Sequence, residues 1–242
     1  MSLPHIKARE GDVARNVIVV GDPARVDLIS RLLEVPRVVN EHRGFKVVTG
    51  SYRGMPVTVA THGIGCPSAS IVFEELAKLG GRRFVRIGTT GGLRPGMSVG
   101  DVVVATGAGY TAGGCSLGQY MPGVCGATSP HPILTARIVE ELNRRGIKHW
   151  LGPVFSSDAF YAEEEGFAER MSKLGFVSVE MECAALFALG WMRGWETSAV
   201  LVVSDVLVGP SKGVFLTTAE LADKFTAVAS AVLEAMRGLA GE

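Results

Sequence analysis

The chain has 242 residues, with 24 basic and 24 acidic side chains and a formal net charge of zero. Neutrality provides no electrostatic basis for binding nucleic acid or an anionic membrane. Hydrophobic residues make up 47% of the chain, which predicts a large buried core. No apolar signal segment opens the chain, and no apolar run approaches the roughly 20 residues of a membrane helix, so we expect a cytoplasmic protein.

In the first part of the chain, short β-branched runs alternate with glycine-rich turns and helical segments. In chain order, the expected elements are a strand at 17–20, a helix at 25–33, strands at 45–51 and 55–61, a helix at 68–79, and strands at 84–87 and 101–105. Arg53-Gly54 between two strands is typical of a hairpin turn, and Pro67 suits the first turn of a helix.

The segment 107–131 is rich in Gly, Ser and Thr, which indicates a long functional loop rather than a linker. After it we expect a helix at 132–146, a strand at 151–156, a charged helix at 163–174, a strand at 177–181, a helix from 183, a strand at 199–203 and a helix at 218–239. Strands alternate with helices and no shift in composition marks a boundary. We therefore predict a single α/β domain over 1–242, around a mostly parallel or mixed sheet.

Two carboxylates, Glu180 and Glu182, lie inside an otherwise apolar run at a predicted strand-to-helix junction. Such junctions hold the ligand sites of many α/β proteins. A carboxylate there can accept hydrogen bonds from the hydroxyl groups of a sugar. The alternative is a glutamate that caps a helix or forms an ion pair.

Three arginines, Arg25, Arg43 and Arg86, stand beside glycine-rich turns at strand ends. Guanidinium groups match the oxygens of phosphate, and backbone N–H groups after Gly21, with the hydroxyl of Thr89, would complete an anion site. The alternative is three separate surface ion pairs, each of which stabilises little.

Asp205 ends an apolar run, where a carboxylic acid can donate a proton to a leaving heterocycle. A helix cap or turn is the alternative role for this aspartate. The glycines of 107–114 do not form a dinucleotide site, because no helix follows them directly.

The four cysteines show neither a CxxC pair nor a zinc-type spacing, and we predict no metal site. Cys115 and Cys125 lie in the glycine-rich segment, where a disulfide within or between subunits is open to them. The scarcity of Asn and Gln is a trend of thermophilic proteins, among which cytosolic disulfides occur.

Several motifs in a fixed order resemble the family of hexameric purine nucleoside phosphorylases and uridine phosphorylases. They are GDPARV (21–26), NEHRGF (40–45), ATHGIGCPS (60–68), RIGTTGG (86–92), SSDAFYAEEE (156–165), VEMECA (179–184) and VVSDVL (202–207). The resemblance covers nearly the whole chain. Within the family, 156–165 and 110–114 look most like archaeal 5′-methylthioadenosine phosphorylases of the purine-cleaving type.

The resemblance implies a fold, a reaction and an assembly. The implied fold is a three-layer αβα sandwich with a mixed, partly barrel-like central sheet. The implied enzyme is a pentosyltransferase that converts a nucleoside and phosphate to a free base and a pentose 1-phosphate, with phosphate as co-substrate and no cofactor. The implied assembly is a homo-hexamer, a trimer of dimers in which a neighbouring subunit completes each site.

Carried over by motif, the resemblance also implies roles for individual residues. Phosphate would be held by Gly21, Arg25, Arg86 and Thr89, with Arg43 from an adjacent subunit. Ribose would be held by Met181 and Glu182, with His5 from a neighbour at the sugar 5′ end. The base pocket would comprise Thr90, Gly91, Phe160, Val179 and Glu180, and Asp205 would protonate the purine.

The same comparison by motif favours purines over uracil. Glu164 and Gly166 stand where uridine phosphorylases carry a Gln and an Arg that read uracil, and Gly44 replaces a glutamate that binds potassium in those enzymes. In one departure from bacterial purine enzymes, no arginine follows Asp205 before the last helix; Lys212 is the nearest cation. Uridine phosphorylase remains the main alternative, followed by a hydrolytic nucleosidase and a non-catalytic binding protein.

Overall fold

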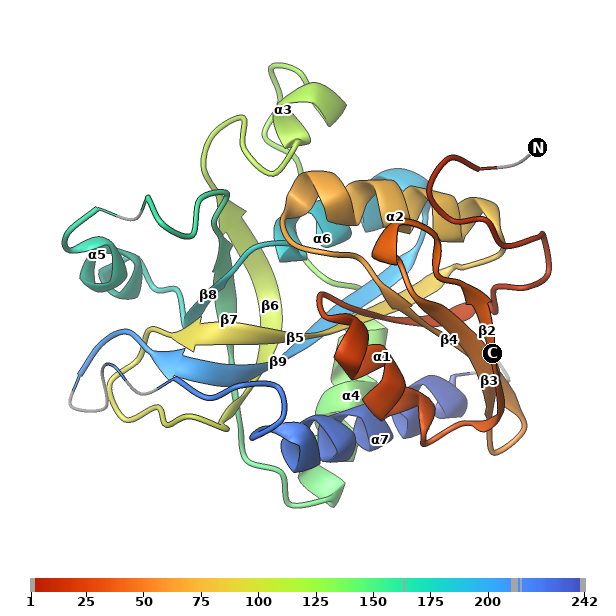
Figure 1. Ribbon diagram of the computed structural model, residues 1–242. Helices are drawn as coiled ribbons and strands as arrows, with labels where there is room; N and C mark the ends of the chain where they lie inside the picture. Colours follow the sequence, from red (N-terminus) through yellow and green to blue (C-terminus); the bar gives the residue numbers. More distant parts are fainter. Residues whose placement is uncertain (1–2, 163, 210–212, 214, 240–242) are drawn as a thin grey trace.

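A nine-stranded mixed sheet forms the centre of the molecule (Figure 1). The computed structural model describes residues 3–162, 164–209, 213 and 215–239. The strands follow the order β2-β3-β4-β1-β5-β8-β7-β6-β9. Their bounds are β1 (Asn16–Val20), β2 (Glu34–Asn40), β3 (Val47–Tyr52), β4 (Met55–Thr61), β5 (Arg83–Gly92), β6 (Val102–Tyr110), β7 (His149–Ser156), β8 (Ser178–Glu180) and β9 (Glu196–Val206).

One end of the sheet closes on itself. Strand β5 pairs with β8 on one side and in parallel with β9 on the other, so that β5, β8, β7, β6 and β9 form a ring. The remaining strands extend from β5 through β1, which is parallel to both β4 and β5. These pairings confirm the mixed, partly barrel-like sheet.

Helices cover both faces of the sheet. The helices α2 (Cys66–Lys78) and α6 (Cys183–Arg193) pack together on one face, while α1 (Pro23–Ser30), α4 (Pro132–Arg144) and α7 (Ala222–Gly238) pack on the other (Figure 1). The shorter elements are η1 (His42–Gly44), α3 (Leu117–Tyr120) and α5 (Phe167–Lys173). The fold is the predicted three-layer αβα sandwich.

Alternation of side chains along the strands explains why both faces are covered. In β1, Val17 and Val19 join the core beneath α2 and α6, whereas Ile18 and Val20 join the core beneath α1, α4 and α7. A strand that is apolar on both faces must be buried on both faces. The described part of the chain contains no helix that is long and apolar enough to cross a membrane.

Most predicted elements are confirmed, with shifted ends. The hairpin at Arg53-Gly54 is present, since Tyr52 pairs with Met55. The predicted loop at 107–131 begins too early, because residues 107–110 continue β6 through parallel pairing with β7. The charged helix predicted at 163–174 is shorter, as α5, and residue 163 lies outside the described residues.

Candidate active site

Five polar side chains from four parts of the chain converge toward the carboxyl ends of the parallel strands. Arg25 comes from α1, which follows β1; His62 follows β4; and Arg86 lies on β5. Glu180 ends β8, and Glu182 precedes α6. All five are buried. This is where ligand sites occur in open α/β sheets, at the carboxyl ends of strands.

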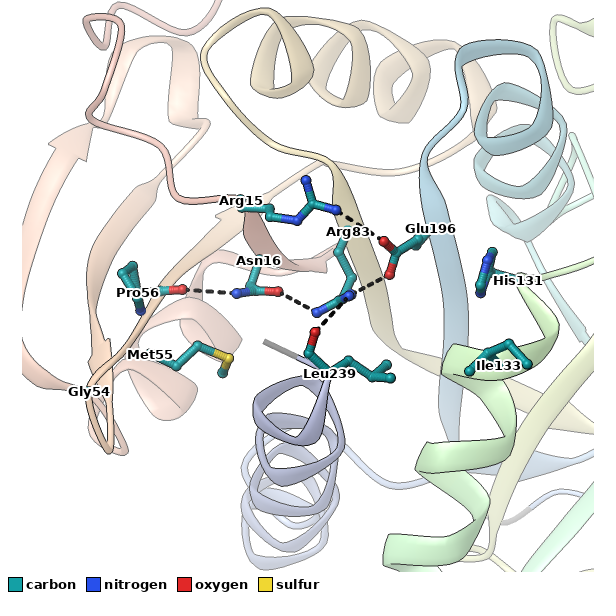
Figure 2. Close-up of a pocket in the computed structure, with 10 residues that line it drawn as sticks. All are labelled: Arg15, Asn16, Gly54, Met55, Pro56, Arg83, His131, Ile133, Glu196 and Leu239. Carbon is teal, nitrogen blue, oxygen red and sulfur yellow. Dashed lines mark hydrogen bonds and ion pairs between the residues drawn. The ribbon is translucent and has the colours of Figure 1, made fainter. Parts of the chain in front are cut away.

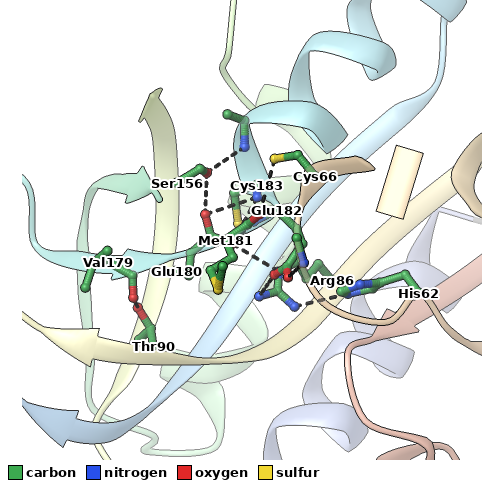
Figure 3. Close-up of polar contacts among 12 residues, drawn as sticks. His62, Cys66, Arg86, Thr90, Ser156, Val179, Glu180, Met181, Glu182 and Cys183 are labelled. Carbon is green, nitrogen blue, oxygen red and sulfur yellow. Dashed lines mark hydrogen bonds and ion pairs between the residues drawn. The ribbon is translucent and has the colours of Figure 1, made fainter. Parts of the chain in front are cut away.

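Arg86 is the centre of the cluster (Figure 3). Its Nη2 lies 2.5 Å from Glu182 Oε2, its Nε donates to Glu180 Oε2 at 3.3 Å, and its Nη1 lies 3.2 Å from His62 Nε2. The guanidinium folds back over Gly88, where an added β-carbon would lie 2.5 Å from Nη1. Glycine at 88 therefore makes room for this conformation.

Burial and neighbouring charges shift the pKa values of Arg86 and Glu182. Burial opposes the charge of Arg86, but the carboxylates of Glu182 and Glu180 outweigh it and raise the pKa of Arg86 above its ordinary value. Burial raises the pKa of Glu182, against the opposing effect of Arg86, and the neighbouring Glu180 raises it further. The Gly65 N–H also donates to Glu182 Oε1 at 2.6 Å.

His62 is neutral and accepts from Arg86. Burial first, then the charges of Arg86 and Arg25, hold the pKa of His62 well below its ordinary value. A guanidinium has only donors, so His62 Nε2 must be the acceptor and the proton resides on Nδ1. Nδ1 itself is buried without a hydrogen-bond partner.

Arg25 is buried but only partly satisfied. Its Nε and Nη1 have no hydrogen-bond partner, and its guanidinium lies 5.2 Å from the centre of the Phe225 ring. Burial, and then the charge of Arg86, lower the pKa of Arg25 to about 10. A second buried cation with unpaired donors is what an anion site requires before its anion arrives.

Glu180 is held by the start of α6. Its carboxylate accepts from the N–H groups of Glu182 at 2.8 Å and Cys183 at 2.9 Å, and from the hydroxyl of Ser156. The same Ser156 oxygen accepts from Ala184 N–H at 2.9 Å. A negative charge at a helix amino terminus is stabilised by the helix dipole. The structure thus gives Glu180 a capping role, which was the alternative considered from the sequence.

The predicted base-pocket residues of β5 and β8 lie together. Thr90 Oγ1 donates to the carbonyl of Val179 at 2.7 Å, and Gly91 pairs with Val179. Gly91 also pairs with Asp205 on β9. Thr89, half-buried, precedes them on β5.

Asp205 lies within β9 rather than beyond its end. A register shift opposite Thr90-Gly91 leaves Ser204 as an extra residue before Asp205, and such bulges re-aim side chains. Ser204 Oγ donates to Asp205 Oδ1 at 2.8 Å. Burial raises the pKa of Asp205, against this hydrogen bond, as a proton donor requires. Lys212 lies outside the described residues.

The predicted site residues His5, Arg43 and Phe160 stand apart from this cluster, whereas Met181 lies between Glu180 and Glu182 (Figure 3). His5 Nδ1 lies 2.7 Å from Glu75 Oε1, and the His5 ring meets the edge of Phe45. Arg43 is exposed on η1, close in sequence to Phe45, with a left-handed φ of 58°. Phe160 is 63% exposed and contacts Tyr161. Met181 is half-buried, and its carbonyl accepts from Cys66 Sγ at 3.2 Å.

The sequence-based reasoning missed His62, Ser156 and Gly65. Each was noticed only as part of a turn or motif. One signal could have found His62. It directly follows β4, and the last residue of β4 pairs with the last residue of β1, so His62 lies beside Gly21 in the turn after β1. The sequence left a disulfide of Cys115 and Cys125 open; within the chain they are not joined, since both are free thiols, and Cys115 is buried whereas Cys125 is exposed.

A separate cavity of about 850 Å³ lies at the opposite ends of the strands (Figure 2). Its polar centre is Arg83, which bonds Glu196 Oε2 at 2.5 Å and Asn16 Oδ1 at 3.2 Å. Arg83 also donates to the carbonyls of Met236 and Leu239, at the end of α7. With its donors used in this way, Arg83 ties the last helix to the sheet, and we assign no chemistry to this cavity.

Comparison with known proteins agrees with this arrangement. The chain is 39% identical over 212 residues to guanosine phosphorylase of Halorubrum lacusprofundi, covering 87% of this chain and 86% of the relative. It is 32% identical over 212 residues to uridine phosphorylase of Thermococcus kodakarensis, covering 82% and 76%. The structure matches purine nucleoside phosphorylase of Toxoplasma gondii in complex with immucillin-H with a TM-score of 0.89 and 29% identity, over 99% of this chain and 97% of the other.

A family profile that covers nearly the whole chain gives the same assignment as these relatives. The sequence profile of the phosphorylase superfamily matches residues 15–239, which include every strand of the sheet and every side chain of the cluster around Arg86. This chain belongs to the phosphorylase superfamily.

Proposed function

We propose that this enzyme is a pentosyltransferase that cleaves purine nucleosides with phosphate, giving the free base and a pentose 1-phosphate. The observation that carries the proposal is the pair of buried arginines, Arg25 and Arg86, beside two buried carboxylates. Phosphate would accept hydrogen bonds from the unpaired donors of Arg25 and also from Arg86, which is paired with Glu182. Glu182 would accept hydrogen bonds from the sugar hydroxyls. The substrates are drawn from inosine, guanosine, adenosine and 5′-methylthioadenosine.

The reaction develops charge of both signs. As the N-glycosidic bond breaks, positive charge builds on the sugar and negative charge on the base, and both must be stabilised. A phosphate oxygen attacks the anomeric carbon, and its negative charge faces the cationic sugar. The electrons of the broken bond go to the base, and Asp205 supplies a proton to the purine ring nitrogen.

The raised pKa of Asp205 supports this last role. An aspartate that is neutral when substrate binds can donate its proton, and burial raises the pKa of Asp205 in that direction. Gly91 pairs with both Val179 and Asp205, so the proposed base pocket would lie next to the proposed acid. Thr90 and Phe160 would complete that pocket, with Thr89 and Gly21 on the phosphate side.

The remaining sugar and phosphate contacts would come from a neighbouring subunit. The His5 ring contacts the ring of Phe45, and Arg43 precedes Phe45 by two residues, so we expect both to enter a partner's site from neighbouring positions. This fits a homo-hexamer of cytoplasmic enzyme chains that needs no cofactor. Uridine phosphorylase is the second candidate, favoured by the relative from Thermococcus kodakarensis, which is less similar than the guanosine phosphorylase.

Product analysis tests the proposal. Inosine is incubated with the enzyme in the presence and absence of phosphate, and the sugar product is identified. We expect hypoxanthine and ribose 1-phosphate, only with phosphate. Free ribose formed without phosphate would show a hydrolase instead, and no base release from any nucleoside would show a binding protein.

A further inference from the structure

Three metal-binding groups lie together outside the proposed reaction chemistry. The Sγ atoms of Cys66 and Cys115 and a carboxylate oxygen of Asp158 are all within 4.8 Å of one another. They come from the first turn of α2, the turn that follows β6 and the loop that follows β7. Residues so far apart in sequence show no metal-binding spacing, and the prediction of no metal site rested on spacing alone.

The two thiols are enclosed, whereas the carboxylate faces solvent. Cys66 and Cys115 are both buried. Each thiol donates to a backbone carbonyl: Cys66 Sγ to Met181 O at 3.2 Å, and Cys115 Sγ to Ser156 O at 3.7 Å. Asp158 is exposed, so the group has two soft donors inside and a hard donor at its mouth.

The backbone is shaped to bring Cys115 and Asp158 together. Cys115 and Ser116 both have left-handed φ angles, of 52° and 63°, which non-glycine residues seldom adopt. Cys115 N–H donates to Asp158 Oδ2 at 2.9 Å. A β-carbon at Gly114 would collide with the same Oδ2. This turn therefore depends on a close approach of the Asp158 carboxylate.

We propose that Cys66, Cys115 and Asp158 form a binding site for one soft divalent cation of the zinc and cadmium class. Thiolate sulfur and carboxylate oxygen are ligands of such cations, and three protein ligands leave a fourth position for water. Binding releases two thiol protons to solvent, and no group is oxidised or reduced.

A disulfide is the competing chemistry for two adjacent thiols. Asp158 separates the two possibilities, because its carboxylate would ligate a cation but has no part in a sulfur–sulfur bond. A bound cation would tie the 111–117 turn to the start of α2. There the Gly65 N–H holds Glu182, so the cation would brace the proposed sugar site from outside.

Cadmium titration of the reduced full-length chain tests the site without any nucleoside, and so independently of the proposed function. Thiolate-to-cadmium charge transfer is followed in the ultraviolet, and equilibrium dialysis gives the stoichiometry. We expect one cadmium ion and two released protons per chain. Cys66→Ser or Cys115→Ser should abolish the absorbance band, and Asp158→Asn should weaken cadmium binding at least tenfold.

Cys125→Ser is the matched control, since Cys125 is an exposed thiol of the same segment and should leave binding unchanged. Asp158 is exposed, so Asp158→Asn keeps the test valid where a buried cysteine variant fails to fold; melting of the metal-free variants checks this. An absent band, a band lost in Cys125→Ser, or unchanged affinity in Asp158→Asn would each overturn the proposal. Loss of two thiols in metal-free solution would assign the pair to a disulfide instead.

Discussion

The two buried guanidinium groups of the site differ in how far their donors are satisfied. Arg86 bonds His62, Glu180 and Glu182, whereas Arg25 has two unpaired N–H donors. A buried unsatisfied donor costs about 1–3 kcal/mol. An anion that accepts from Arg25 would recover that free energy on binding, so Arg25 should contribute chiefly to phosphate affinity.

Substitution of Arg25 by Gln should therefore raise the KM for phosphate without lowering stability. Hydrogen bonds to charged groups contribute about 1.5–3 kcal/mol, which corresponds to roughly a 10- to 100-fold rise. Steady-state kinetics at saturating nucleoside measures the rise, and thermal unfolding measures stability. Arg31→Gln, at the exposed end of α1, is the control and should leave both unchanged. An unaltered phosphate KM in Arg25→Gln would count against the assignment.

Asp205 should impose a fall in kcat at high pH. Its pKa is raised by burial, so the acid is protonated below that raised pKa and loses its proton as the pH rises through it. Asp205→Asn should lower kcat for inosine on the order of 10²- to 10⁴-fold and remove the fall. In Ser204→Ala, loss of the hydrogen bond that lowers the Asp205 pKa should move the fall to higher pH. A pH profile identical in all three enzymes would refute proton donation by Asp205.

Single site residues could be predicted where they lie in a recognisable sequence motif. Residues whose role depends only on tertiary packing could not. Arg25, Arg86 and Glu182 lie in motifs beside turns that the sequence pattern marks, and the structure brings them together. His62 was not singled out, because an isolated histidine beside glycines carries no chemical signal until β4 and β5 place it against Arg86. The capping role of Glu180 depends on where α6 begins, which residue types alone do not specify.

At the scale of elements, β5 carries much of the site. It places Arg86 at its middle and Thr90 and Gly91 near its end, and it pairs with β8 and β9 on its two sides. Gly88 permits the folded-back conformation of Arg86. The strand therefore positions the proposed phosphate and base contacts in one rigid piece.

Gly88→Ala should disable the site while preserving the sheet. The added methyl group would displace the Arg86 guanidinium, so we expect at least a tenfold loss in kcat/KM for phosphate, with far-ultraviolet circular dichroism unchanged. Gly107→Ala on β6 is the matched control, since its nearest neighbour, Thr128 O, would be at an ordinary 3.6 Å. Equal activity of the two variants would show that the Arg86 conformation is not needed.

The sequence predicted which strands and helices are present more accurately than the residues at which they begin and end. Strand β5 was expected to stop before Gly88, because glycines usually end strands, yet pairing with β8 and β9 carries it to Gly92. Strand β2 was not expected, since it is mostly exposed and contains Pro36. Backbone hydrogen bonds to β3 hold this segment as a strand, although its own sequence has no strand pattern. Both errors concern hydrogen bonds between distant segments, which local periodicity does not report.

At the scale of the whole molecule, His5 and Arg43 point to an assembly. His5 contacts Phe45 and Glu75, and Arg43 is exposed two residues before Phe45; among the described residues, neither hydrogen-bonds or ion-pairs with Arg86 or Glu182. The left-handed backbone of Arg43 holds an exposed cation on a tight turn, a strained arrangement of the kind found at ligand sites. Shared sites between subunits would explain this placement.

Complementation between two inactive variants tests the sharing of sites. Arg43→Ala and Glu182→Gln are each expected to lose most activity. After co-refolding, an Arg43→Ala chain beside a Glu182→Gln chain has its own Glu182 and receives the partner's intact arginine, so activity should return. Mixtures of either variant with itself are the controls. A mixture no more active than its parts, or a fully active monomer, would rule out a donated Arg43.

Base release from inosine, guanosine, 5′-methylthioadenosine and uridine, each with and without phosphate, tests the central claim most directly. We predict phosphate-dependent release from purine nucleosides, with kcat/KM for the best purine at least tenfold above that for uridine. The comparison among the purines then identifies the preferred 5′ substituent. Phosphate-dependent release from uridine alone would contradict the roles given to Asp205, Glu164 and Gly166. Base release at the same rate with and without phosphate would contradict the proposed phosphate site at Arg25 and Arg86.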